Sequence, residues 1–151
     1  MLVRVQAEAF DLNDEIVAIT HGRQDIGGIG SFVGLVRGGA DFISLTLEHY
    51  PGMTEKMLEH IATAAMARFD LLDVTLIHRI GTLRAGAPIV LVLAAAKHRG
   101  QALGATEFLI DWLKTDAPFW KQERTTQGAQ WVEPRAADRQ AADRWRTDPN
   151  F

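Results

Sequence analysis

The fold is decided by residues 89–114, IVLVLAAAKHRGQALGATEFLIDWLK. Residues 89–96 are apolar without alternation, which is typical of a strand that is covered on both faces. Residues 100–114 follow with apolar side chains at helical spacing, and Leu103, Leu109, Ile110 and Leu113 are expected to form the inner stripe. Asp116-Ala-Pro118 ends this pattern. The stretch therefore predicts a buried strand followed by a long amphipathic helix.

On either side of this stretch, apolar runs with glycine or proline breaks predict further elements. The predicted strands are residues 2–9, the second half of 27–39 up to Arg37, 42–50, 74–80, 119–124 and 130–132. The predicted helices are residues 11–21, capped by Asp11 or Asn13, and residues 54–69. The strand that ends at Arg37 is expected to turn at Gly38-Gly39 and to pair with residues 42–50. This order predicts an α+β fold with helices against a mainly antiparallel sheet.

Composition sets the size and excludes several classes of protein. The 151 residues, 47% of them apolar, fit one domain over residues 1–135 and a charged C-terminal tail or short helix over 136–151. A net charge of −3 argues against general binding to nucleic acid or membrane surfaces. No apolar run approaches the ~18 residues of a membrane span. Residues 1–6 lack a signal-peptide pattern, so a cytoplasmic location is expected.

Basic side chains follow predicted strands where the chain turns. Arg37 is either a solvated strand end or a guanidinium that grips an anion, because the glycines after it let a ligand approach the backbone. Lys97-His98-Arg99 opens the helix of residues 100–114, where free N–H groups and the helix dipole favour an anion. Three adjacent basic side chains repel one another and work against that dipole, so stability alone does not explain them. His78-Arg79 runs into a turn at Gly81 and is interpreted as structural.

Further charges gather around the end of the same helix. Lys114 lies in the last turn, where a lysine favourably caps the helix dipole. Lys121 and Glu123 are two residues apart and so lie on one face of an extended segment. They form either a surface ion pair or, beside a buried electropositive pocket, a site whose lysine is a general acid or nucleophile.

Several motifs occur in a specific order along the chain. They are Phe32-Val-Gly-Leu-Val-Arg37, Leu47-Glu-His-Tyr50 with Met53, His78-Arg-Ile-Gly81, His98-Arg99, Lys114 and Pro118-Phe-Trp-Lys-Gln-Glu123 with Trp131. Together they resemble the catalytic, or large, subunit of molybdopterin synthase, from about Gly28 to Trp145. The resemblance implies an α/β hammerhead-type fold with an additional antiparallel β subdomain, and makes residues 1–135 the catalytic domain.

The resemblance also implies an activity and its residues. The activity is conversion of cyclic pyranopterin monophosphate to molybdopterin by addition of two sulfurs as a dithiolene, with no metal or cofactor. Lys114 and Lys121 are the implied catalytic residues. The implied substrate-binding positions are Leu35, Val36, Arg37, His98, Arg99, Lys114, Lys121, Gln122 and Glu123, with Phe32 and Arg135 as further pocket residues. Leu103 stands where the family usually has phenylalanine, and a repacked core is expected there.

The same resemblance implies the partners. Sulfur arrives as a thiocarboxylate on the C-terminal Gly-Gly of a small ubiquitin-like subunit, and two large subunits form a homodimer within a heterotetramer. The sequence contains no cysteine, so disulfides, zinc–thiolate sites and a cysteine nucleophile are excluded. A sulfur transferase of this composition needs sulfur from a second molecule. The alternative is a non-catalytic module that binds a phosphorylated small molecule or a partner's C-terminal tail through the same basic groups.

His98 and Lys114 lie at opposite ends of the predicted helix. Their separation of sixteen positions, at about 1.5 Å per residue, places them roughly 24 Å apart. One small pterin cannot touch both. We expect either a composite site, to which the second subunit of a homodimer supplies His98 and Arg99, or a sharp break in the helix at Gly104. The composite site is favoured because a single glycine costs stability without turning the chain back.

Overall fold

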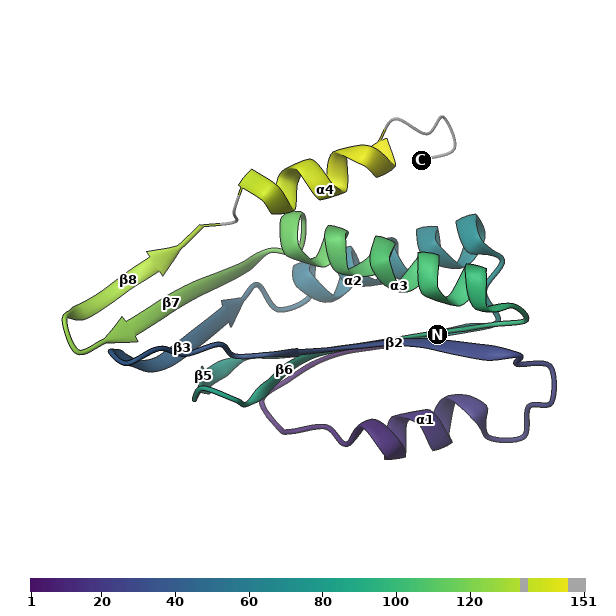
Figure 1. Cartoon of the computed structure of the whole chain (residues 1–151), viewed down its shortest axis with the longest axis horizontal. Helices are drawn as coiled ribbons and strands as arrows, with labels where there is room; N and C mark the ends of the chain where they lie inside the picture. The colour runs from purple at the N-terminus through teal and green to yellow at the C-terminus, as the bar shows by residue number, and fades with distance from the viewer. Residues whose placement is uncertain (134–135, 147–151) are drawn as a thin grey trace.

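The structure, a computed structural model, describes residues 1–133 and 136–146. Figure 1 shows its elements, with helices on both sides of one sheet and a second sheet at one end. In chain order they are β1 (Leu2–Gln6), α1 (Leu12–Thr20), β2 (Gly28–Leu35), β3 (Phe42–His49), α2 (Met53–Phe69), β4 (Asp73–Arg79), β5 (Gly81–Leu83), β6 (Pro88–Ala96), α3 (Arg99–Thr115), β7 (Phe119–Thr125), β8 (Gly128–Val132) and α4 (Ala136–Arg146).

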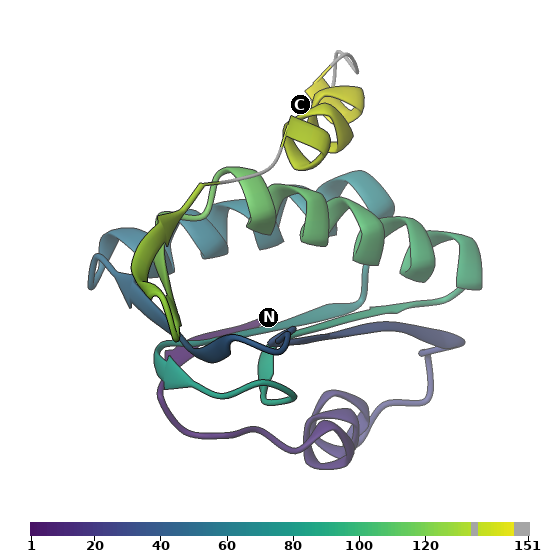
Figure 2. The same cartoon turned by 60° about the vertical axis from the view of Figure 1, so that its left-hand side comes forward.

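The first sheet has the strand order β1-β4-β6-β2 and places β6 in its interior. β1 runs parallel to β4, and the other two pairs are antiparallel. Leu91 and Leu93 of β6 pack with Ile19 on the side of α1. Val92 and Ala94 belong to the larger core under α2 and α3 (Figures 1 and 2). The prediction of a strand covered on both faces is confirmed.

Helix α3 packs so closely on its neighbours that only small residues fit along its first turns. A Cβ at Gly30 of β2 would lie 2.4 Å from the carbonyl oxygen of Ala102. A Cβ at Gly104 would lie 3.1 Å from the ring of Phe69 in α2. Leu103 is 61% exposed, so its predicted place on the inner stripe is wrong and its position causes no repacking of the core. The buried face is formed by Ala102, Ala105, Thr106, Phe108, Leu109, Trp112 and Leu113.

The second sheet has the strand order β5-β3-β7-β8, and all its pairs are antiparallel. The predicted pairing of β3 with the strand before it is wrong, because β2 belongs to the first sheet and ends at Leu35, short of Arg37. Gly38 passes so close to Ala85 that a Cβ there would lie 2.6 Å from the Cβ of that alanine. Gly38-Gly39 therefore lies in the segment that carries the chain from one sheet to the other and closes no hairpin.

A small core joins the two sheets. It contains Val36, Leu47, Leu83 and Ile89. Leu83 belongs to β5, a strand that is missing from the sequence-based prediction because three residues are too few to show a pattern. With this joint, the chain has the expected α+β architecture: a hammerhead-type unit of sheet and helices, and an additional antiparallel β subdomain.

Helix α4 packs over α3 (Figure 1), where two of its side chains contact that helix. The Arg144 guanidinium contacts Asp111 at 2.6 Å and Glu107 at 2.8 Å. The Trp145 Nε1 donates to Asp111 at 2.8 Å, and its ring lies 5.4 Å from that of Phe108. The aromatic contact gives α4 a share in the main core. In the part of the chain that the structure describes, no helix is long and apolar enough to cross a membrane.

Candidate active site

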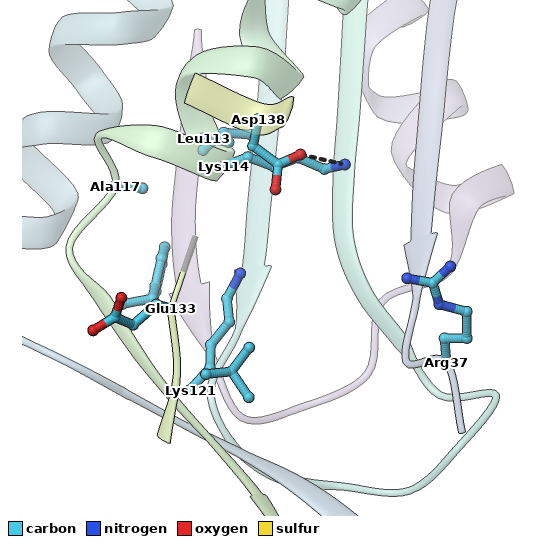
Figure 3. A pocket seen from close by; sticks show the side chains of 9 residues that line it. Arg37, Leu113, Lys114, Ala117, Lys121, Glu133 and Asp138 are labelled. Atoms are coloured by element: carbon cyan, nitrogen blue, oxygen red, sulfur yellow. Dashed lines mark ion pairs between the residues drawn. The ribbon is translucent and has the colours of Figure 1, made fainter. Parts of the chain in front are cut away.

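The end of α3, strand β7 and the first turn of α4 enclose a cavity of about 220 Å³. Figure 3 shows the amino groups of Lys114 and Lys121 and the guanidinium of Arg37 pointing toward the space between them. The lining residues are Arg37, Leu113, Lys114, Ala117, Phe119, Lys121, Val132, Glu133 and Asp138. Three cations face two carboxylates, so the cavity has an excess of positive charge. It therefore suits an anionic ligand.

The tight connection between α3 and β7 brings the two lysines together. Helix α3 ends at Thr115, and the Phe119 N–H donates to the Ala117 carbonyl at 2.8 Å, which turns the chain directly into β7. Lys121 pairs with Leu47 of β3 on one side and with Val132 of β8 on the other. Because side chains alternate along a strand, Phe119 and Lys121 project from the same face of β7 into the cavity.

Burial and neighbouring charge perturb Lys121. Burial lowers the pKa of its ammonium, and the positive charge of Lys114 lowers this pKa further, while the carboxylate of Asp138 raises it. The Lys114 Nζ lies 3.6 Å from Asp138 Oδ1. A lysine whose pKa is lowered gives up its proton more readily than an ordinary lysine, as proton transfer in catalysis requires. This favours the reading of Lys121 as a reactive group over that of a surface ion pair.

His78 lies directly behind the cavity wall. Its ring stacks on Phe119 at a centroid distance of 3.9 Å and an angle of 19°. Burial lowers the pKa of this histidine to about 4, and its Nδ1 lies 2.9 Å from the carbonyl oxygen of Arg79. Arg79 in turn donates to the carbonyls of Ala7 and Pro88. These contacts support the interpretation of His78-Arg79 as structural.

The second basic cluster lies elsewhere on the subunit. Lys97, His98 and Arg99 line a separate open pocket with Gly27 and Gly100. Helix α3 runs without interruption from Arg99 to Thr115, so the alternative of a sharp break at Gly104 is wrong. A straight helix keeps His98 roughly 24 Å from Lys114. The structure therefore brings Arg37, Lys114 and Lys121 together and leaves His98 and Arg99 apart from them.

The remaining predicted positions that the structure describes do not line the cavity. Phe32 packs against the main core from β2. Leu35 is exposed, and Val36 is buried in the core between the sheets. Gln122 alternates with Lys121 on β7 and so faces away from the cavity, whereas Glu123 shares the face of Lys121. A further predicted residue, Arg135, lies outside the described residues.

Sequence reasoning missed two carboxylates of the cavity, Glu133 and Asp138. Glu133 follows β8, and Asp138 lies in the first turn of α4. In the sequence, Asp138 is one of several charges in an alanine-rich segment, and nothing local separates it from a solvated surface residue. Only the packing of α4 on α3 places it at the cavity.

A mixed α+β fold that places two lysines and an arginine around one cavity fits the class of proteins that bind anionic molecules. The family model described as the MoaE protein matches residues 5–116. The chain belongs to this family, and the resemblance seen in the sequence is confirmed. It is 52% identical to the molybdopterin synthase catalytic subunit of Ralstonia nicotianae over 95% of this chain and 83% of that protein. The corresponding subunit of Pseudomonas aeruginosa is 48% identical over 96% of this chain and 99% of that protein.

Solved structures agree with this assignment. The molybdopterin biosynthesis MoaE protein from Burkholderia ambifaria is 45% identical, with a TM-score of 0.84 over 97% of this chain and 99% of that one. Molybdopterin synthase from Staphylococcus aureus is 26% identical, with a TM-score of 0.77 over 85% of this chain and 95% of that one. The likeness covers both the hammerhead-type unit and the β subdomain.

Proposed function

We propose that this chain is the catalytic subunit of a molybdopterin synthase. It converts cyclic pyranopterin monophosphate to molybdopterin, using the thiocarboxylate sulfur of a small ubiquitin-like subunit. The observation that carries the proposal is the meeting of Arg37, Lys114 and Lys121 at one cavity, in a chain whose relatives are named molybdopterin synthase catalytic subunits along nearly its whole length.

The cavity's charges fit the chemistry of both reactants. The substrate carries a phosphate, and the donor tail ends in a thiocarboxylate, so both are anions. The Arg37 guanidinium binds the substrate anion, and a fork of N–H donors suits a phosphate in particular. The partner's extended tail enters beside Lys114 and Lys121. Without cysteine in the sequence, the sulfur has to come from this tail.

Sulfur transfer proceeds in two steps. The thiocarboxylate sulfur attacks a substrate carbon, so that a C–S bond forms while the C–O bond at that carbon breaks and the leaving oxygen takes up a proton. Partner and substrate are then joined through an acyl–sulfur link, and a second thiocarboxylated partner supplies the second sulfur in the same way. Water then attacks the acyl carbon, so that the sulfur stays on the substrate and the partner leaves as a carboxylate. Lys114 and Lys121 stabilise the negative charge that develops, and Lys121, whose pKa burial lowers, moves protons.

The substrate site is composite, and the second subunit of a homodimer supplies His98 and Arg99. Two observations support this. The uninterrupted α3 keeps those residues away from Lys114 within one chain. The cavity of about 220 Å³ is also smaller than the ~300–1,000 Å³ of most small-molecule sites, as expected for half of a shared site. Each large subunit of the dimer then holds one small subunit, which gives a heterotetramer.

Reconstitution tests the proposal. The purified chain is mixed with thiocarboxylated small subunit and cyclic pyranopterin monophosphate, and molybdopterin is measured by chromatography. A control partner without its terminal Gly-Gly should still dock but deliver no sulfur. Transfer from that control would show that the donor assignment is wrong. Substrate binding without any product from the intact partner would favour a non-catalytic binding module.

A further inference from the structure

Helices α3 and α4 carry charges of opposite sign at both ends of their contact. At one end, Arg144 of α4 contacts Glu107 and Asp111 of α3. At the other end the signs are reversed, because Asp138 of α4 contacts Lys114 of α3. Both ion pairs form at the same time because the two helices run antiparallel. Docking of α4 through Arg144 therefore brings Asp138 to the cavity edge.

The pair of Lys114 and Asp138 is not explained by stability alone. Its Nζ–Oδ1 distance is 3.6 Å, and the two side chains are 51% and 26% exposed. Exposed ion pairs of this kind contribute little to folding. A carboxylate in the first turn of a helix also stabilises the helix through its interaction with the helix dipole, but that effect does not require Asp138 to face a lysine. Figure 3 shows the pair at the cavity, above Lys121.

We propose that Asp138 is a positioning residue of the reaction assigned above: its carboxylate holds the Lys114 ammonium at the cavity and offsets the charge of the two lysines. The inference rests on the proposed function for its catalytic consequence. The effect of the Asp138 carboxylate on the protonation of Lys121 does not depend on that function and can be measured in the chain alone. Asp138 acts through the lysines.

The groups around Lys121 define this effect. The cavity lining brings Lys114 from α3, Asp138 from α4, Glu133 from just after β8 and Arg37 from the segment after β2. Glu123 lies on the same face of β7, and His78 lies behind it on β4. Of these charges, Lys114 lowers the pKa of Lys121 and Asp138 raises it. Without the Asp138 carboxylate, the charge of Lys114 is no longer offset, and the pKa of Lys121 should fall further.

The first test needs no activity. The full chain is labelled with ¹³C-lysine, the Lys121 resonance is assigned with Lys121→Arg, and its pH titration is followed by NMR. In Asp138→Asn, Lys121 should lose its proton at lower pH than in the wild type. Asp138→Glu keeps the charge and should titrate like the wild type. Asp14→Asn, an identical change in α1 on the opposite face of the first sheet, is the matched control and should also leave Lys121 unchanged.

The second test uses the reconstituted reaction. If Lys121 acts as the protonated acid, kcat of Asp138→Asn should fall with rising pH earlier than that of the wild type, with a loss of about threefold on that limb, the effect of one partly screened charge. KM should change less than kcat. An inactive wild type would refute the proposed function but leave the NMR test intact.

Either of two results would overturn the inference. Thermal unfolding and the NMR signal of the Trp145 indole N–H, which donates to Asp111, report whether α4 stays docked. If Asp138→Asn lowers only the stability of the chain while Lys121 titrates as in the wild type, Asp138 serves the helix alone. If Asp138→Asn undocks α4, the Asp138→Glu variant becomes the test. A carboxylate is still present in Asp138→Glu, so a shifted titration of Lys121 in this variant would contradict the proposal.

Discussion

Acidification should destabilise this protein through one buried histidine. Burial lowers the pKa of His78 to about 4, whereas an unfolded chain leaves it near the ordinary 6.5. The folded state therefore binds this proton less readily than the unfolded state. The contribution of the neutral ring is complete above pH 6.5 and is lost as the pH falls from there through 4.

The size of the loss follows from the two pKa values. A difference of about 2.5 units, at about 1.36 kcal/mol per unit, corresponds to about 3 kcal/mol once the pH is below both. At pH 5 the unfolded histidine is almost fully protonated and the folded one is mostly neutral, so about 2 kcal/mol is already lost. This is a large part of the stability of an ordinary domain.

Urea denaturation at pH 7 and pH 5 measures the effect, and His78→Phe isolates it. Phenylalanine keeps a ring against Phe119 but does not titrate, so the variant should lose about 2 kcal/mol less than the wild type between the two pH values. Carboxylates contribute equally to both proteins and cancel. His60→Gln, which removes an exposed histidine of α2, is the control and should behave like the wild type. An equal pH dependence in His78→Phe and the wild type would refute the reasoning.

Three further predictions concern the reaction. Lys114→Ala and Lys121→Ala should each abolish most product formation while thermal unfolding and partner binding stay near wild type. Lys121→Arg should not restore activity, because arginine does not release its proton. Near-normal product from both alanine variants would contradict the roles assigned to these lysines. Arg37→Ala should weaken substrate binding in calorimetry by about 1.5–3 kcal/mol and partner binding less, and unchanged substrate affinity would remove Arg37 from the site. Mixing inactive His98→Ala with inactive Lys114→Ala should restore activity through one intact site per heterodimer, and confirmed subunit exchange without activity would contradict the shared site.

Much of the first sheet could be predicted because its signals are local. The unbroken apolar run of β6 and the proline-terminated pattern of α3 need no knowledge of distant residues. The assignment of β3 to a separate sheet was not predictable in this way. Gly38-Gly39 is compatible with a tight turn and with a close crossing past Ala85, and only the register of the whole sheet decides between them.

The candidate site was predictable in part. The family resemblance pointed to Lys114, Lys121 and Arg37 together. It could not supply Asp138, because the docking of α4 depends on contacts such as Trp145 with Phe108, far apart in sequence. The prediction that Leu103 lies on the buried face of α3 was wrong for a related reason. Hydrophobicity placed it inside, but the close approach of Gly30 and Gly104 to their neighbours leaves room only for small residues on the buried side of that turn.

The continuous α3 has a consequence for how this chain can change in evolution. Its two ends carry His98-Arg99 and Lys114, and the helix between them acts as a spacer of fixed length and phase. Deleting one residue would shorten the spacer by only about 1.5 Å but would rotate one end by about 100° relative to the other. An exposed position such as 103 is free to vary in side chain, whereas insertions and deletions within α3 should be absent from functional relatives.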